Sequence, residues 1–265
     1  MAEYIKWADL VNHIERINHG DIIYLVSDVT NLALRALQEK DRFDGNVLLD
    51  QLIDRIGPKG TLLIPTFNWD FCKGKGFDYR KTISQTGALG NTALKRNDFR
   101  RTQHPIYSFA VWGKDKEFLC SMENTDAWGP GTPFSYMQEN AAKALILGLE
   151  NTHGVTSKLH IEQTVGVPYR YIKNFTASYT DADGNTTERT YSMNVRDYDL
   201  DPQYVEPQTV FSRILRDLNI LHTQYINDIP VSTLLLKELE EVETIEIKCN
   251  KCRNMYTYKG QNDNE

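Results

Sequence analysis

Several classes of protein are excluded by what this sequence lacks. No run of about 18 apolar residues occurs, and the charged N-terminus holds no apolar core, so neither a membrane span nor a signal peptide is expected. The 4 cysteines do not form the disulfide framework of a secreted protein. With a net charge of −6, the chain has no excess of Lys and Arg for nucleic-acid phosphates. We therefore predict a cytoplasmic protein with neither a membrane nor a nucleic acid as partner.

The signatures of metal and nucleotide sites are also missing. Cys249 and Cys252 form a single CxxC pair, whereas a structural zinc site needs four ligands, so no metal is expected. The glycines of CKGKGF (72–77) fit neither GxxxxGK[ST] nor GxGxxG. No loop of the [QR]xxGx[GA] type used by GNAT acetyltransferases is convincingly placed, which disfavours that fold.

The residues that are present describe an ordinary globular protein, with 40% hydrophobic and 25% charged residues. Short apolar runs between turn residues predict strands, and apolar residues at helical spacing predict helices. The predicted strands cover 22–26, 61–67, 107–112 and 143–149, and the predicted helices cover 3–18 and 46–56. A strand, a helix and a strand in succession favour a mixed, largely parallel central sheet flanked by helices.

The chain changes character after about residue 175, where polar and β-prone residues alternate around Asp183-Gly184-Asn185. This pattern predicts an antiparallel hairpin, and two amphipathic helices are predicted near 207–219 and 231–240. We expect a single α/β domain over 1–265, with a core in 1–175 and an antiparallel and helical C-terminal part in 176–265.

The segment richest in chemistry is 151–170, where a strand ends and a helix is predicted to begin after Ser157. His160 lies in the first turn of that helix, with Glu162 nearby. A histidine titrates near neutrality and a carboxylate can orient its ring, which suits general base catalysis. The alternative is a capping or surface histidine, since residues two apart do not share a helix face.

Several motifs, in this order, resemble the aminoglycoside 3-N-acetyltransferase (antibiotic N-acetyltransferase) family. They are GDIIYLVSDVTNL (20–32), IGPKGTLLIPTF (56–67), TGALGNTALKR with RTQHPIYSFAVWG (86–113), and GPGTP with LILGLENTHGVTSKLHIEQ (129–163). The resemblance covers roughly residues 20–175. It implies a single acyltransferase domain with an α/β fold distinct from GNAT, in which acetyl-CoA or another short acyl-CoA donates directly to an amine.

The resemblance also implies site residues. His160 matches the family's catalytic histidine and would act as the general base. The family spacing is His-x-x-Glu, which here ends on Gln163, so Glu162 and Asp199 are the candidates for orienting the histidine. The residues expected on the CoA side are Ser27, Asp28, Thr30, Ser84, Gly87, Ala88, His104 and Ser108.

The acceptor side departs from the antibiotic-modifying members, because the loop after PTF is short. It holds an aromatic platform with cations alongside, made of Asn68, Trp69, Phe71, Lys73 and Lys75. Such a set suits the base and pyrophosphate of a nucleotide-activated amino sugar, such as a dTDP-amino-dideoxyhexose of polysaccharide synthesis. The alternatives are an aminoglycoside acceptor, and a relative that binds CoA or sugar without catalysis; Trp69 and Phe71 can also be core residues. The oligomeric state is left open, a homodimer included.

Overall fold

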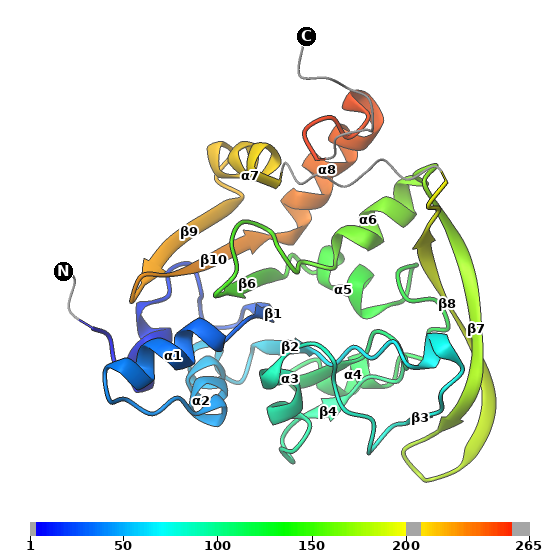
Figure 1. Ribbon diagram of the computed structural model, residues 1–265, viewed down its shortest axis with the longest axis horizontal. Helices are drawn as coiled ribbons and strands as arrows, with labels where there is room; N and C mark the ends of the chain where they lie inside the picture. The colour runs from blue at the N-terminus through cyan, green and yellow to red at the C-terminus, as the bar shows by residue number, and fades with distance from the viewer. Residues whose placement is uncertain (1–3, 200–207, 256–265) are drawn as a thin grey trace.

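The computed structural model describes residues 4–199 and 208–255, and a mixed sheet runs through its centre (Figure 1). Within this part of the chain the strand order is β4-β5-β2-β1-β6-β10-β9. The central strands β2 (Thr61–Pro65), β1 (Ile22–Ser27) and β6 (Lys143–Leu147) pair in parallel. The outer strands pair antiparallel and are β4 (Arg100–Arg101), β5 (Phe109–Gly113), β10 (Ile229–Leu235) and β9 (Leu221–Ile226).

Both faces of the central sheet are buried, which explains the uninterrupted apolar runs of its strands. Ile23 and Leu25 of β1 pack into one cluster, and Tyr24 and Val26 into the other, as the two-residue repeat of a strand requires. The first cluster includes residues of the short helix η1 (Trp7–His13) and of α1 (Thr30–Gln38), α2 (Gly45–Ile56) and α3 (Ala88–Ala93). The second includes residues of α4 (Lys116–Cys120), α5 (Pro133–Glu139), α6 (Lys158–Val165), α7 (Gln208–Asp217) and α8 (Leu236–Asn250).

A second sheet stands beside this core and consists of a long hairpin with a short third strand (Figure 1). Its strands are β7 (Arg170–Thr180), β8 (Thr186–Arg196) and β3 (Phe77–Asp78), and the one-turn helix η2 (Phe71–Lys73) precedes β3. The hairpin turn forms because the Asp181 carboxylate accepts the N–H groups of Asp183 and Asn185, both at 2.9 Å, while Gly184 adopts φ +90°.

The predicted α/β class is confirmed, and within the central sheet the described parallel pairings join β1 to β2 and β1 to β6. The predicted hairpin is also present. The helix predicted over 231–240 is wrong in its first half, because Val-Ser-Thr-Leu-Leu at 231–235 belongs to β10 and pairs with β6 and β9. The helix predicted over 3–18 is wrong in extent, because among the described residues 4–18 only Trp7–His13 is helical, as a 3-10 helix. Helix α1 and strand β9 were not predicted, and no described helix is long and apolar enough to cross a membrane.

Candidate active site

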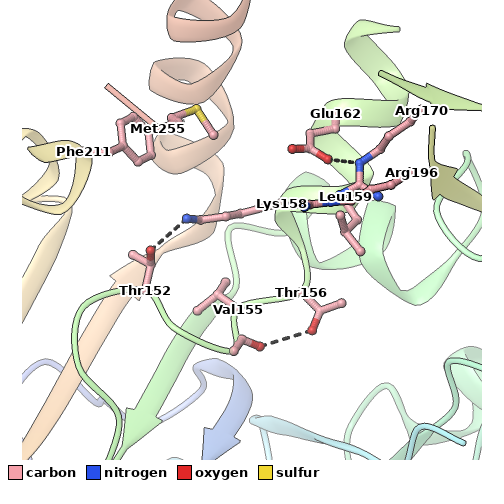
Figure 2. A pocket seen from close by; sticks show the side chains of 11 residues that line it. Thr152, Val155, Thr156, Lys158, Leu159, Glu162, Arg170, Arg196, Phe211 and Met255 are labelled. Carbon is pink, nitrogen blue, oxygen red and sulfur yellow. Dashed lines mark hydrogen bonds and ion pairs between the residues drawn. The ribbon is translucent and has the colours of Figure 1, made fainter. Parts of the chain in front are cut away.

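A cleft lies at the carboxyl ends of β1, β2 and β6, where crevices of open α/β sheets bind ligands. It consists of two adjoining pockets that share Gly154 and Thr156. The β1 pocket, of about 180 Å³, is lined by residues that include Ser27, Pro65, Phe67, Thr86 and Gly87. The α6 pocket, of about 230 Å³, is lined by residues that include Thr152, Val155, Lys158, Leu159, Glu162, Arg170, Arg196, Phe211 and Met255 (Figure 2). We refer to the two together as the strand-end cleft.

The loop between β6 and α6 forms the boundary between the two pockets. Gly154 adopts φ +77°, and a Cβ added to it would lie 2.9 Å from Cγ1 of Val26. The Thr156 N–H lies 3.4 Å from the hydroxyl of Tyr24, so the loop is tied down over the end of β1. The close approach of loop and strand therefore depends on the missing side chain at position 154.

Cationic side chains dominate the α6 pocket. The Nζ of Lys158 donates to the Thr152 hydroxyl at 2.8 Å, and Arg170 forms an ion pair with the fully buried Glu162 carboxylate (Figure 2). The Tyr169 hydroxyl also donates to Glu162, at 3.2 Å. With Arg196 the pocket has three cationic residues, against one carboxylate among the described residues of its lining.

His160 lies on the other side of α6. Its Nδ1 donates to the carbonyl of Trp128, which leaves Nε2 as the unprotonated nitrogen of the neutral ring. The imidazole lines a cavity of about 430 Å³, together with residues that include Ser135, Gln138, Thr164, Lys237 and Glu240. That cavity shares none of its described lining residues with the strand-end cleft. The role of His160 as the base therefore stays a prediction.

The Trp128 carbonyl, and not a carboxylate, orients the His160 ring. Glu162, the first candidate for orienting His160, faces the α6 pocket and accepts a hydrogen bond from Arg170 instead. Gln163 donates from Nε2 to Asp126 at 2.6 Å. Asp199 is exposed in the turn after β8, and its N–H donates to the Asp197 carboxylate at 3.1 Å. Only the tertiary structure could reveal a backbone carbonyl as partner.

Comparison with known proteins decides the family. The sequence pattern of the family described as aminoglycoside 3-N-acetyltransferase matches residues 33–242. The chain belongs to this family. The expectation of an acyl-CoA N-acyltransferase that uses acetyl-CoA is thereby confirmed.

Solved structures of family members share the fold of this acetyltransferase. The structure of aminoglycoside acetyltransferase AAC(3)-Xa superposes with a TM-score of 0.76 at 20% identity, covering 92% of this chain and 94% of that one. AAC-IIIb, solved as a binary complex with CoASH, gives 0.75 at 17% identity, with 94% and 98% covered. AAC-VIa bound to sisomicin gives 0.73 at 17% identity, with 94% and 99% covered. A search of the curated proteins found no match.

Some of the residues expected on the CoA side of the acetyltransferase line the β1 pocket, and the others lie outside its lining. Ser27 and Gly87 line the β1 pocket. Asp28 accepts the Thr30 N–H at 2.9 Å, and hydrogen bonds from Thr30 hold the pKa of Asp28 below its usual range. Ala88 is the first residue of α3, and Ser84 is buried. The sequence reasoning missed Gly154 and Thr156, for which a turn after a strand was the only signal.

Neither His104 nor Ser108 is among the described lining residues of the strand-end cleft, and their expected role stays a prediction. His104 is 1% exposed, its Nδ1 accepts the Tyr107 N–H at 3.1 Å, and burial lowers its pKa to about 3. The ring is therefore neutral and organises the turn into β5. Ser108 is fully buried, and its hydroxyl bonds to Thr66 at 2.8 Å and to Arg101 at 2.9 Å. Both residues stabilise the fold beneath the cleft.

The loop expected to bind the acceptor is also placed differently. Phe71 is buried in the core against Tyr191, and Asn68 donates to the Ile83 carbonyl at 3.0 Å. Trp69 is half-buried and donates to the Tyr107 hydroxyl at 3.2 Å. Lys73 and Lys75 lie 3.8 and 3.2 Å from carboxylate oxygens of Asp70. None of these five residues is among the described lining residues of the strand-end cleft. Their side chains take part in aromatic packing, local hydrogen bonds and local ion pairs instead.

Proposed function

We propose that this protein transfers the acetyl group of acetyl-CoA to an amino group of an amino sugar, directly and within a ternary complex. The observation that carries the proposal is the family match over residues 33–242, which includes β2, β6 and α6 of the strand-end cleft. The name of the family makes an aminoglycoside the first acceptor to test. AAC-VIa, of similar fold, is described as bound to sisomicin.

The donor fits the neutral end of the cleft. The β1 pocket is partly apolar, which suits the pantetheine arm of CoA, and the hydroxyls of Ser27, Thr86 and Thr156 can supply polar contacts. Helices α1 and α6 begin at the same edge of the sheet, and their first N–H groups attract anions. These features support binding of the thioester in the β1 pocket.

The reaction requires a neutral amine. The acceptor ammonium gives up a proton, its nitrogen attacks the thioester carbonyl, the C–N bond forms and the C–S bond breaks. The CoA thiolate leaves and takes up the second proton of the nitrogen. Holding both substrates in adjoining pockets supplies much of the acceleration. His160 is the base predicted from the sequence, and its place on the far side of α6 makes this the point to test.

A nucleotide-activated amino sugar is the second candidate acceptor. The observation that favours it is the set of Lys158, Arg170 and Arg196 in the α6 pocket. These cations repel a polycationic antibiotic and attract a phosphate. The aminoglycoside candidate is supported by the family name, and this second candidate by the charges of this chain.

Release of the CoA thiol from acetyl-CoA tests the proposal. The purified protein should release thiol only when an amino sugar is present, and mass spectrometry should show one added acetyl group on the sugar. Kanamycin and gentamicin are compared with a dTDP-amino-dideoxyhexose at equal concentration. Turnover of the antibiotics alone would exclude the second candidate. If none of these acceptors causes thiol release at concentrations up to about 1 mM, the proposal is overturned and the protein is a non-catalytic relative.

A further inference from the structure

Arg101 is a buried cation that bonds to three separate segments of the chain. It is the last residue of β4, and it is 3% exposed. Its guanidinium donates from Nε to the Ser108 hydroxyl at 2.9 Å, from Nη2 to the Thr66 carbonyl at 3.1 Å and from Nη1 to the Thr82 carbonyl. These acceptors lie before β5, after β2 and in the loop between β3 and α3. One side chain therefore joins three parts of the fold.

The surroundings of Arg101 fix its guanidinium in one orientation. The carbon Cζ lies 4.7 Å from the ring centroid of Phe77, which is buried. The Tyr79 hydroxyl donates to the backbone carbonyl of Arg101. Burial lowers the pKa of Arg101 to about 10, so the group is charged at pH 7 and forms charge-assisted hydrogen bonds. A planar group held by a ring and by three acceptors fixes the positions of the atoms that it bonds.

Two of the three acceptors belong to segments that line the β1 pocket. Thr66 directly precedes Phe67, which is one of the lining residues. Thr82 lies in the loop between β3 and α3, which contributes Thr86 to the same lining. Arg101 therefore connects two segments of the wall of this pocket.

The same two segments are also joined by their backbones. The Phe67 N–H donates to the Thr86 hydroxyl at 3.2 Å, and the Gln85 N–H donates to the Phe67 carbonyl at 2.8 Å. Arg101 adds a charged connection three residues earlier in the loop, at Thr82. Connections at two points along a loop limit both its distance from the strand and its tilt. The spacing of this wall therefore depends in part on Arg101.

We propose that Arg101 is a positioning residue for the donor, because it fixes the spacing between the end of β2 and the loop before α3 in the β1 pocket. This inference rests on the proposed acetyl transfer and concerns the donor side of the same site. Arg101 is not among the described lining residues of the strand-end cleft, so it acts through Phe67 and Thr86. Shifts of about 1 Å in such supported residues are enough to weaken the function of a site.

The first experiment measures KM and kcat of Arg101→Lys with acetyl-CoA and with the amino sugar that the parent acetylates. Lysine keeps the charge but cannot bond to three acceptors in one plane. The KM for acetyl-CoA should rise at least about fivefold, whereas kcat and the KM for the amino sugar should change less than about twofold. Ser108→Ala removes the acceptor of Nε and leaves Arg101 in place, and it should raise the KM for acetyl-CoA at least about threefold.

Leu52→Ala is the matched control for a general loss of stability. Leu52 is fully buried on α2 and is not among the described lining residues of the strand-end cleft. The variant should unfold at a lower urea concentration than the parent, yet its KM for acetyl-CoA should stay within about twofold of the parent value. An equal rise of this KM in the control would overturn the inference. An unchanged KM for acetyl-CoA in both Arg101→Lys and Ser108→Ala would overturn it too.

Amide hydrogen exchange measures the mobility of the loop itself. In Arg101→Lys the amides of Gln85 and Thr86 should exchange at least about tenfold faster than in the parent, while those of β1 and β6 keep their rates. A raised KM for acetyl-CoA with unchanged exchange in the loop would contradict the positioning role, because the effect would then have another route.

Titration with CoA separates failure of the inference from failure of the proposed function. If the parent acetylates none of the amines, the proposed function fails, and calorimetry with CoA still tests Arg101. The parent should bind CoA at least about fivefold more tightly than Arg101→Lys. Equal binding by the two proteins, or none by the parent, contradicts the positioning role.

Discussion

The two sides of α6 carry different side chains, and only one side faces the strand-end cleft. Lys158 and Glu162 are four residues apart and line the α6 pocket together, whereas His160, midway between them, points to the opposite side. Leu159 also lines the pocket. The family spacing His-x-x-Glu, counted back from Glu162, ends on Leu159. Leu159 thus lines the cleft, whereas the resemblance places the imidazole at position 160, outside it.

His160→Ala tests the base predicted from the sequence. Because the imidazole lies outside the strand-end cleft and bonds to the Trp128 carbonyl, we expect kcat to fall by less than about tenfold. The free energy of unfolding should fall by about 1–3 kcal/mol, since a buried hydrogen bond is lost and a cavity is left. Steady-state kinetics and urea denaturation measure the two effects. A fall in kcat of a hundredfold or more, with stability nearly unchanged, would instead establish His160 as the base.

Gly154→Ala tests the residue that joins the two pockets. The backbone at φ +77° and the 2.9 Å approach to Val26 both oppose a side chain, so the variant should lose about 1–2 kcal/mol of stability. The loop must move away from β1, so the KM for acetyl-CoA should rise several-fold with kcat less affected. Gly166→Ala also has a positive φ but open space around it, and serves as the control. Equal KM values in the two variants would contradict a role of this loop in donor binding.

At the scale of elements, helix α8 contributes a buried acid to the contact with α6. Glu243 is fully buried, and neither carboxylate oxygen has a hydrogen-bond partner in the part of the chain that the structure describes. Burial raises its pKa from 4.5 to about 8, with Glu162 adding to the rise and Lys158 opposing it. A carboxyl group here is thus kept protonated by its surroundings at neutral pH.

The titration of Glu243 predicts a pH-dependent stability. Between about pH 4.5 and 8 the folded protein retains this proton while the unfolded chain releases it, so stability falls as pH rises through this window. Glu243→Gln cannot ionise, and its free energy of unfolding at pH 8 should exceed that of the parent by about 1–3 kcal/mol. At about pH 4.5 the two proteins should differ much less. Urea denaturation at several pH values measures the free energy of unfolding of both proteins. An equal dependence of this free energy on pH in the two proteins would contradict the assignment.

At the scale of the whole molecule, the C-terminal part completes the central sheet. Strand β10 pairs antiparallel with β6, which pairs in parallel with β1, and α8 packs against α5 and α6. The fully buried Leu234, Leu236 and Leu239 belong to the same cluster as Tyr24 and Phe109 of the core strands. Strand β10 and helix α8 are therefore integral to the core that they contact.

Truncation after residue 218 tests this dependence. Removal of β9, β10 and α8 exposes the edge of β6 and the apolar face beneath α8. The burial that is lost should exceed the small net free energy of folding of an ordinary domain. We expect the truncated chain to lose its cooperative unfolding transition in circular dichroism, whereas truncation after residue 255 should keep it. A folded, cooperative 1–218 fragment would show that the core is independent of its C-terminal strands.

The sequence alone determined the features that depend on local patterns and on motif order. Buried strands, the hairpin turn at Asp181–Asn185, the start of α6 and the family itself could all be derived, because apolar periodicity and turn chemistry are local. Only the tertiary structure decided which side chains share a space. It placed His160 outside the cleft, moved 231–235 into the sheet, and brought Lys158, Arg170 and Arg196 together from separate elements. Such neighbours are set by strand pairing and helix rotation, which no local pattern encodes.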